Sequence, residues 1–313
     1  MRVTLLILIV LLAALTGVSG CAHWTAEQKA PPIGRLVDAA GQRLHVVDIG
    51  PKDSAMPPLV LIHGASVNLR DMKMALGDRL AENRRVILID RPGRGYSTRG
   101  EDGWRLGAQA RDIKAAVDAL GVDRPVVVGQ SLGGAVALRY ALDYQDEIGG
   151  LVLLAPVSHE WPGGVAWYNN VSQWPVAGVL LRRLVVPAYG QLTARAGVAR
   201  NFAPNPAPEN YYDESGLSLL FRAKDFKANA ADLANLKQEI IAQQARYSEL
   251  SMPVAIVTGM DDSTVSPDLH SKRLAKEIPG ATLTLLPQTG HALHHAETDR
   301  IVAVIEEISE RAR

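Results

Sequence analysis

The chain has little cysteine: Cys21 is the only one in 313 residues. A single thiol excludes a disulfide within the chain and a metal site built from several cysteines. The eight histidines do not show zinc-ligand spacings with acidic partners, apart from a C-terminal group considered below. The sequence therefore predicts no metal and no other cofactor.

The chain also lacks an excess of either charge. It has 33 basic and 33 acidic residues, no long basic run, and only 5% aromatic residues. Nucleic-acid binding is therefore not expected, because it needs a basic surface and usually aromatic stacking platforms. The length and a hydrophobic content of 47% favour one large α/β domain, or such a core with an insertion.

The N-terminus is apolar. Met1 and Arg2 precede an apolar run over residues 3–18, which is near the lower limit for spanning a bilayer and is typical of a secretory signal. Residues 18–21, Val-Ser-Gly-Cys, resemble the lipobox of bacterial lipoproteins, in which the signal is cut before the cysteine and the thiol is acylated. The resemblance implies a signal peptide over residues 1–20 and lipidation of Cys21.

This resemblance also implies a location. The protein would sit on the periplasmic face of the bacterial cell envelope, held at the membrane by its lipid. Residues 21–33, with a Pro31-Pro32 pair, would be an exposed tether. An uncleaved membrane anchor, or a plain signal peptide with a free thiol, remain alternatives.

The most informative stretch is residues 124–142. Residues 126–128 are three valines typical of a strand buried on both faces, and residues 132–142 are rich in Ala and Leu and predict a buried helix. Between them lies Gly-Gln-Ser-Leu-Gly, which places Ser131 at a tight bend with its hydroxyl above the sheet. Ser131 is therefore a candidate nucleophile, although a structural turn serine is the alternative.

Strands and helices alternate through most of the chain, which predicts a parallel sheet covered by helices on both sides. Expected strands are residues 35–38, 43–49, 59–62, 86–89, 126–128, 151–154, 254–258 and 283–286. Expected helices are residues 68–82, 106–120, 132–142, 268–278 and 301–308.

The alternation stops between residues 155 and 252. A loop of that length without structure is improbable, so residues 158–250 are expected to form a helical cap. Helices are expected over residues 176–186 (ended by Pro187), 217–223 and 230–245. Three tryptophans of this segment either pack the cap on the core or form an apolar wall above Ser131: Trp161, Trp167 and Trp174. The helix at 176–186 has a second interpretation, in which it rests on a membrane surface.

Two further motifs lead to a family resemblance. His63-Gly64 follows an expected strand, and residues 90–97 read Asp-Arg-Pro-Gly-Arg-Gly-Tyr-Ser. With the serine bend, these motifs resemble the α/β-hydrolases over residues 34–157 and 251–313. The resemblance implies an α/β-hydrolase fold with a mostly parallel central sheet and a helical cap inserted after the sixth strand. It also implies that His63 is structural.

The same resemblance implies the remaining site residues. The backbone N–H groups of Ala65 and Leu132 would form the oxyanion hole. The acid stands three residues after Gly259, which selects Asp262, with Asp261 and Glu160 as competitors.

The base would follow the last strand in Gly290-His291, which selects His291. His294 and His295 are expected at a helix start or on the surface, and a metal site made from the three histidines is the alternative.

Ser131, Asp262 and His291 occur in the order that this fold requires. They predict a serine hydrolase that cleaves carboxylic esters of a partly apolar small molecule through an acyl-enzyme. Hydrolysis of carbon–carbon bonds in ring-cleavage products and cofactor-free perhydrolysis are alternatives. Dehalogenase and epoxide hydrolase chemistry are disfavoured, since relatives with those activities place Asp at the bend. From another class, a tethered binding protein on a hydrolase scaffold is also considered.

Overall fold

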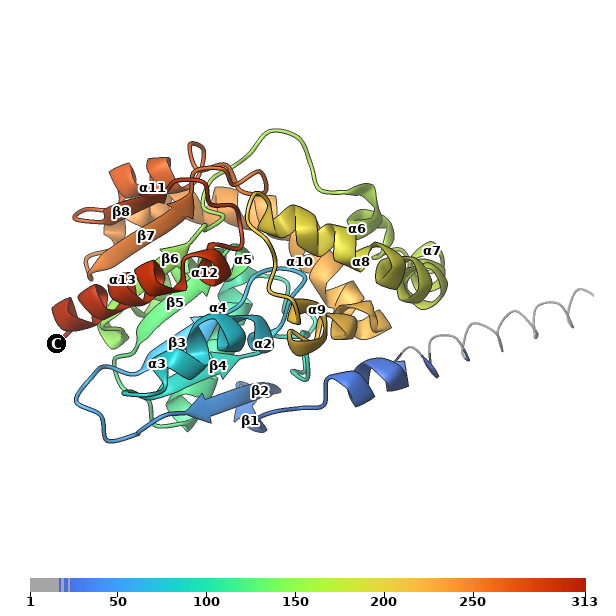
Figure 1. The fold of residues 1–313 in the computed structure, drawn as a ribbon, viewed down its shortest axis with the longest axis horizontal. Helices are drawn as coiled ribbons and strands as arrows, with labels where there is room; N and C mark the ends of the chain where they lie inside the picture. The colour runs from blue at the N-terminus through green and yellow to red at the C-terminus, as the bar shows by residue number, and fades with distance from the viewer. Residues whose placement is uncertain (1–16, 18–19, 22) are drawn as a thin grey trace, which may run out of the picture.

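An eight-stranded sheet forms the centre of the computed structural model, which describes residues 17, 20–21 and 23–313 (Figure 1). The order is β1-β2-β4-β3-β5-β6-β7-β8, and only β2 runs antiparallel to its two neighbours, β1 and β4. The predicted α/β fold with a mostly parallel sheet is confirmed. The strands are β1 (Arg35–Ala39), β2 (Gln42–Ile49), β3 (Leu59–Ile62), β4 (Val86–Ile89), β5 (Val126–Gln130), β6 (Gly150–Leu154), β7 (Val254–Gly259) and β8 (Thr282–Leu286).

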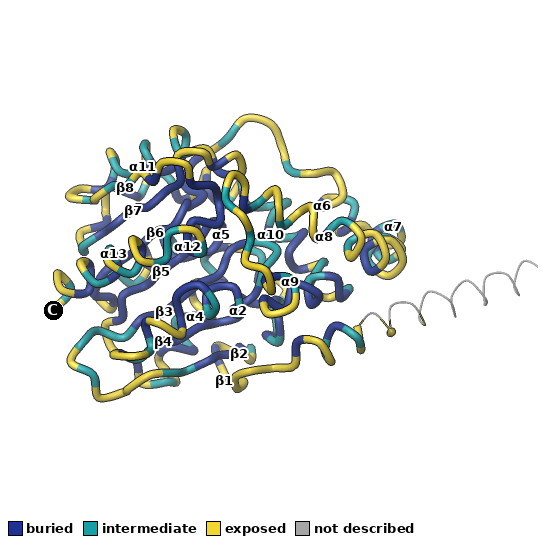
Figure 2. The backbone as a smooth tube through the Cα atoms, viewed as in Figure 1, coloured by how far each residue is buried: buried dark blue, intermediate teal, exposed yellow. Residues whose placement is uncertain are grey.

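Helices cover both faces of this sheet. Alternate strand residues point to opposite faces, so Val60 and Val127 join one core and Leu61 and Val128 join the other. The first face is covered by α4 (Leu106–Ala119), α5 (Leu132–Tyr144) and α11 (Ser271–Glu277). The second is covered by α2 (Leu69–Met72), η1 (Lys73–Gly77), α3 (Asp78–Leu80), α12 (Leu293–Ala296) and α13 (Thr298–Arg311). The inner strands β3, β4, β5, β6 and β7 are buried along their length, whereas the edge strands β1 and β8 are partly exposed (Figure 2).

The helix expected over residues 68–82 is present but is not a uniform α-helix. Asn68 caps it by accepting a hydrogen bond from the Arg70 N–H, and a π-helical turn, η1, lies between α2 and α3. Such a turn inserts one residue into the helical spacing.

A segment of helices lies between β6 and β7, and we call residues 155–253 the insert (Figure 1). Its helices are α6 (Trp167–Val171), α7 (Ala177–Leu180), η3 (Leu181–Val185), α8 (Val186–Phe202), α9 (Tyr211–Glu214), η4 (Leu217–Phe221), α10 (Ala223–Gln243) and η5 (Gln244–Glu249). The boundaries of the cap at residues 158 and 250 stay a prediction.

The expectation that a helix ends at Pro187 was wrong. Pro187 lies in the first turn of α8, directly after the π-helical η3, and the chain stays helical to Phe202. Proline is tolerated there because its missing N–H and its fixed φ angle suit the first turn of an α-helical segment.

A buried arginine ties the insert to the core. The guanidinium of Arg91, after β4, donates to the Asp232 carboxylate of α10 over 2.8 Å and to the His63 carbonyl over 3.0 Å. All three residues are at most 2% exposed, so the charge of Arg91 is neutralised away from water. The loop after β3 and the longest helix of the insert are therefore held in one arrangement.

The N-terminal part of the chain lies against the insert. Residues 23–29 are helical, Ala26 and Ala30 pack against Leu219, and Glu27 pairs with Arg222 over 2.7 Å. Cys21 is exposed. Most of the predicted signal peptide, residues 1–20, lies outside the described residues. Within the part of the chain that is described, no helix is both long and apolar enough to cross a membrane.

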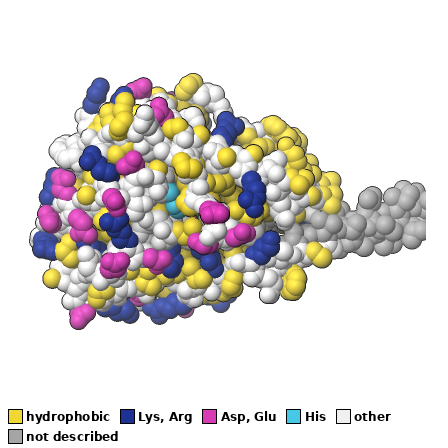
Figure 3. Space-filling view, viewed as in Figure 1, with side chains coloured by type: hydrophobic (Ala, Val, Ile, Leu, Met, Phe, Trp, Pro, Cys, Tyr) yellow, Lys and Arg dark blue, Asp and Glu magenta, His cyan; other side chains and the backbone are white. Residues whose placement is uncertain are grey.

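Lys and Arg side chains intermingle with Asp and Glu on the core face seen in Figure 3, as the zero net charge suggests.

A buried polar cluster joins three helices. Asp71 of α2 accepts hydrogen bonds from His294 over 2.8 Å, from His295 over 3.0 Å and from the Tyr211 hydroxyl over 2.6 Å. Of the two expectations for His294 and His295, the helix start is confirmed, because both lie in the first turn of α12, and the surface position was wrong, because their side chains are only 3% and 4% exposed. Sequence could not pair them with a carboxylate more than 200 residues away.

Burial alone would raise the pKa of Asp71, but the two histidines hold it well below its ordinary value. Burial lowers the pKa of His294, and burial together with Asp71 raises the pKa of Tyr211. The cluster therefore holds a carboxylate anion to which three side chains donate hydrogen bonds.

We expect Asp71→Asn to lower the free energy of unfolding by about 3 kcal/mol at pH 7, because it replaces the anion that accepts from three buried donors with a neutral amide, whose NH₂ group cannot accept. Since the folded-state pKa of Asp71 is lowered, its contribution is present above the unfolded pKa of about 3.9 and is lost as the pH falls through the folded value. Urea denaturation measures both effects. Asp78→Asn is the matched control, since that carboxylate is 61% exposed and should change the stability by less than about 0.5 kcal/mol.

Candidate active site

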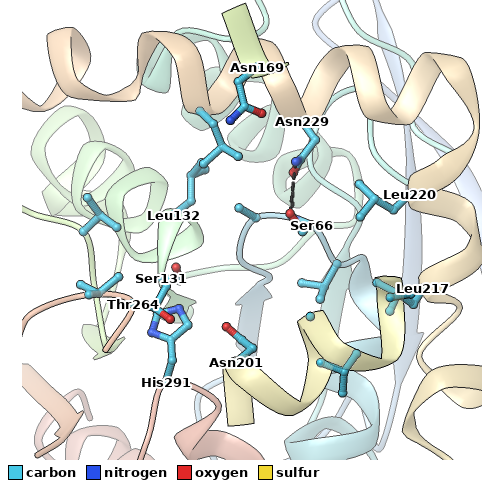
Figure 4. A pocket seen from close by; sticks show the side chains of 18 of the residues that line it. Ser66, Ser131, Leu132, Asn169, Asn201, Leu217, Leu220, Asn229, Thr264 and His291 are labelled. Carbon is cyan, nitrogen blue, oxygen red and sulfur yellow. Dashed lines mark hydrogen bonds between the residues drawn. The ribbon is translucent and has the colours of Figure 1, made fainter. Parts of the chain in front are cut away.

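Ser131 occupies the junction of β5 and α5 in a strained conformation. Its φ of 55° and ψ of −119° are unusual for a residue with a side chain. Four backbone hydrogen bonds hold it there: its N–H donates to Leu154, and its carbonyl accepts from Gly134, Ala135 and Val157. The side chain lies at the positive end of α5 and reaches the cavity described below (Figure 4).

The two glycines of the pentapeptide are required by close backbone contacts. A Cβ on Gly129 would overlap the Gly133 carbonyl oxygen, and a Cβ on Gly133 would overlap the carbonyl oxygens of Ile62 and His63. The helix can therefore begin against the ends of β3 and β5 only because these positions lack side chains.

His291 and Asp262 form a buried hydrogen-bonded pair. His291 Nδ1 lies 2.7 Å from Asp262 Oδ2, and the two side chains are 5% and 0% exposed. The other oxygen, Oδ1, accepts from the N–H groups of Thr264 over 2.8 Å and Val265 over 2.9 Å. With Nδ1–H donating to the carboxylate, Nε2 carries the lone pair and is suited to accept a proton.

The competing acids lie elsewhere. Asp261 and Glu160 are both exposed. The Asp261 N–H donates to the Thr289 carbonyl, and the Glu160 N–H donates to the Gln244 side chain. Of the three carboxylates considered, Asp262 is the one that contacts His291.

Gln130 is a site residue that sequence reasoning missed. Its amide nitrogen lies 3.3 Å from His291 Nε2 and 3.4 Å from the His291 carbonyl. Within residues 23–313 no hydrogen bond joins the Ser131 hydroxyl to His291, although Figure 4 shows the two side chains next to each other. Gln130 therefore holds the ring near Ser131, and catalytic hydrogen bonds of this kind often tighten only in the substrate complex.

Of the two expected oxyanion donors, Ala65 lies in the loop after β3 and Leu132 is the first residue of α5. Ala65 and Leu132 both line the cavity beside Ser131. His63 is fully buried, its Nε2 accepts from the Arg91 N–H, and burial lowers its pKa to about 3. A neutral imidazole locked into the core shapes this loop, as the resemblance implied.

A second contact to this loop comes from the insert. The Ser66 N–H donates to the Asn229 side chain over 2.6 Å, and the Asn229 amide donates back to the Ser66 hydroxyl over 3.2 Å (Figure 4). Asn229 lies on α10, so the insert positions the loop that carries Ala65. Only the tertiary structure could reveal this pair, because the residues are 163 positions apart.

A cavity of about 1370 Å³ lies over Ser131, between the sheet and the insert. Aliphatic and aromatic side chains from the insert form most of its wall, including Leu181, Val186, Phe221 and Leu236. Trp161 and Trp167 line it, whereas Trp174 is 57% exposed and does not. Within the described chain no Lys or Arg lines this cavity, so it is suited to a neutral, largely apolar molecule.

The structure separates the three histidines considered for a metal site. His291 is paired with Asp262, while His294 and His295 meet Asp71 in the buried cluster, with their ligand atoms within 4.8 Å of one another. Each of the two histidines already donates a hydrogen bond to Asp71. The arrangement around Ser131 thus consists of an alcohol, an imidazole and a carboxylate.

Comparisons with known proteins agree with this architecture. The chain is 28% identical over 295 residues to haloalkane dehalogenase 2 of Mycobacterium tuberculosis, covering 89% of this chain and 95% of that protein. It is also 28% identical over 298 residues to 2-hydroxymuconate semialdehyde hydrolase of Pseudomonas putida, covering 90% and 95%.

Among solved structures, an α/β hydrolase fold protein from Burkholderia ambifaria has a TM-score of 0.71 at 25% identity, over 88% of this chain and 99% of that one. The family model described as the alpha/beta hydrolase fold matches residues 57–298. The chain therefore belongs to the α/β-hydrolase fold family.

Proposed function

We propose that this protein is a serine hydrolase that cleaves carboxylic esters of neutral, largely apolar small molecules through an acyl-enzyme. The observation that carries the proposal is that Ser131 and the His291–Asp262 pair line one cavity, which Ala65 and Leu132 also line and which has no Lys or Arg among its described residues. Each of these groups has a role in acyl transfer.

The reaction proceeds in two halves. His291 Nε2 takes the proton of Ser131 as its oxygen attacks the ester carbonyl carbon, and the N–H groups of Ala65 and Leu132 receive the developing oxyanion. His291 then returns the proton to the leaving alcohol. A water molecule, deprotonated by His291, attacks the acyl-enzyme and releases the acid, while Asp262 fixes the imidazole tautomer.

Carbon–carbon hydrolysis is the second candidate, and the relatives favour it. Besides the hydrolase from Pseudomonas putida, a 2-hydroxy-6-oxo-6-phenylhexa-2,4-dienoate hydrolase of Burkholderia cepacia is 27% identical over 265 residues. A dienoate carries a carboxylate, which a binding site normally pairs with a cation. We place ester cleavage first because the cavity offers no such cation among its lining residues.

Dehalogenation is not proposed, despite the similarity to a haloalkane dehalogenase. Attack of the Ser131 oxygen on an alkyl halide would give an alkyl ether, which has no carbonyl for water to attack and would not turn over. Perhydrolysis remains an alternative within the same mechanism, because hydrogen peroxide could attack the acyl-enzyme in place of water.

The location proposed for the enzyme follows from the sequence. Lipidation of Cys21 after removal of residues 1–20 would hold the protein on the periplasmic face of the bacterial cell envelope, with its active site outside the cytoplasm.

Replacement of the nucleophile tests the proposal directly. We expect Ser131→Ala to reduce turnover of p-nitrophenyl esters by about 10³-fold or more, because no other group forms the acyl-enzyme. A fluorophosphonate probe should label the wild type and not the variant. Absence of labelling in folded wild type would favour the binding-protein alternative.

The choice of the acid is tested by a matched pair of substitutions. Asp262→Asn should lower kcat by about 10³- to 10⁴-fold, because the amide would favour the wrong tautomer of His291. Asp261→Asn should stay within about twofold, since that side chain is exposed. Equal losses in the two variants would contradict the assignment.

The two candidate reactions differ in substrate charge. We expect kcat/KM for a neutral p-nitrophenyl ester to exceed that for a vinylogous diketone dienoate by at least about 10²-fold, because a buried carboxylate without a cation is costly. The measurement is steady-state kinetics with both substrates. Preference for the dienoate would replace ester cleavage with carbon–carbon cleavage.

A further inference from the structure

The insert carries an apolar surface that faces solvent. Six side chains of the helical stretch from Val176 to Leu192 are large, hydrophobic and at least 36% exposed. Their spacing of mostly three or four residues places them along one side of the helical stretch that α7, η3 and α8 form. We call this surface the cap face: Val176, Leu180, Leu184, Val185, Tyr189 and Leu192. Leu192 is 83% exposed and Val176 is 72% exposed, so these side chains are not the partly buried edge of the hydrophobic core.

The charges within the segment that carries the cap face have one sign. No Asp or Glu occurs between Glu160 and Glu209, whereas four arginines do: Arg182, Arg183, Arg195 and Arg200. The last three are exposed. In a chain with equal numbers of acids and bases, this local excess of positive charge complements an anionic surface.

The N-terminal part of the chain enters the protein at the same end. The helix that includes residues 23–29 lies beside the insert (Figure 1), where Ala26 and Ala30 pack against Leu219. Trp24 on this helix is 66% exposed. Immediately before it in the sequence are Cys21 and the apolar run of residues 3–18. A membrane attachment through either of them would bring the insert, rather than the core, toward the lipid.

We infer that the cap face rests on an anionic phospholipid bilayer. An exposed apolar helix face flanked by arginines, without acids, has the composition of helices that lie in the headgroup region. Hydrophobic side chains gather over this end of the molecule in the view of Figure 3.

The cavity opens toward the same surface. Trp167, Tyr168, Val185 and Tyr189 both line the cavity and are exposed, so they form part of its rim. Two of these rim residues belong to the cap face. If the proposed esterase function holds, on which this step rests, the substrate is an apolar ester that enters from the bilayer.

Docking can be measured without activity. The full-length protein is incorporated into vesicles of phosphatidylglycerol and phosphatidylcholine, with and without brominated acyl chains, and its tryptophan fluorescence is recorded. Trp174, directly before the cap face, should be quenched by the bromine atoms. The Leu184→Glu/Leu192→Glu double variant should lose about half of the quenching, because its charges keep the face out of the headgroup region. Neither residue lines the cavity.

Matched variants separate docking from attachment and charge. Leu285→Glu, on the distant strand β8, is the control for an added charge at an exposed leucine and should quench as the wild type does. Flotation of the vesicles tests whether every variant stays attached through the N-terminal segment. Arg183→Glu/Arg200→Glu, or vesicles of phosphatidylcholine alone, should reduce the quenching. Trp174→Phe identifies the share of the signal that comes from the cap face.

Three outcomes would overturn the inference. One is quenching that is the same in Leu184→Glu/Leu192→Glu as in the wild type. Another is no quenching in protein that floats with the vesicles. The third is a dimer, seen by sedimentation velocity, that the double variant abolishes, which would assign the cap face to a second copy of the chain.

Substrate entry has its own measurement. Turnover of an ester dissolved in the vesicles should fall about tenfold in the double variant, while a water-soluble ester is hydrolysed at the wild-type rate. Ser131→Ala should dock normally, so failure of the proposed reaction and failure of docking are distinguishable.

Discussion

The structure depends on one strained residue, Ser131, at the point where β5 turns into α5. A positive φ is costly for a residue with a side chain, and here it is enforced by backbone hydrogen bonds and by glycines that admit close backbone contact. The sheet supplies the rigidity for this strain, because β5 is buried between β3 and β6. Because of this conformation, the Ser131 side chain projects away from the sheet at the start of α5.

Everything else at the site is positioned relative to that hydroxyl. β7 and the loop after it bring Asp262, the loop after β8 brings His291, and the loop after β3 brings the Ala65 N–H. The insert holds two loops at the ends of the strands: Asn229 bonds Ser66 in the loop after β3, and Asp232 bonds Arg91 in the loop after β4. The insert therefore both encloses the cavity and positions the loop after β3. We expect substitutions in α10 to change the position of the Ala65 N–H in that loop.

The insert also faces outward, and there its composition differs from that of the core. The core surface mixes acids with bases. The segment that carries the cap face has exposed apolar side chains and arginines, and no Asp or Glu occurs in it between Glu160 and Glu209. One stretch of helix therefore has an inner side that shapes an apolar cavity and an outer side suited to lipid. Together with the proposed lipidation of Cys21, this arrangement supports the proposal of a substrate found at a membrane.

The sequence by itself determined the β-branched strands, the order of the motifs and the position of the insert, because these depend on residue type and local spacing. It identified Ser131 from the Gly-Gln-Ser-Leu-Gly bend between a strand and a helix, and Asp262 and His291 only through the family resemblance. Only the tertiary structure showed the contacts of Gln130 with His291 and of Asn229 with Ser66. It alone also showed Asp71 between two histidines and a helix that continues past Pro187. The side-chain pairings join residues far apart in the chain, and their partners are chosen by how the elements pack, a property that no local pattern contains.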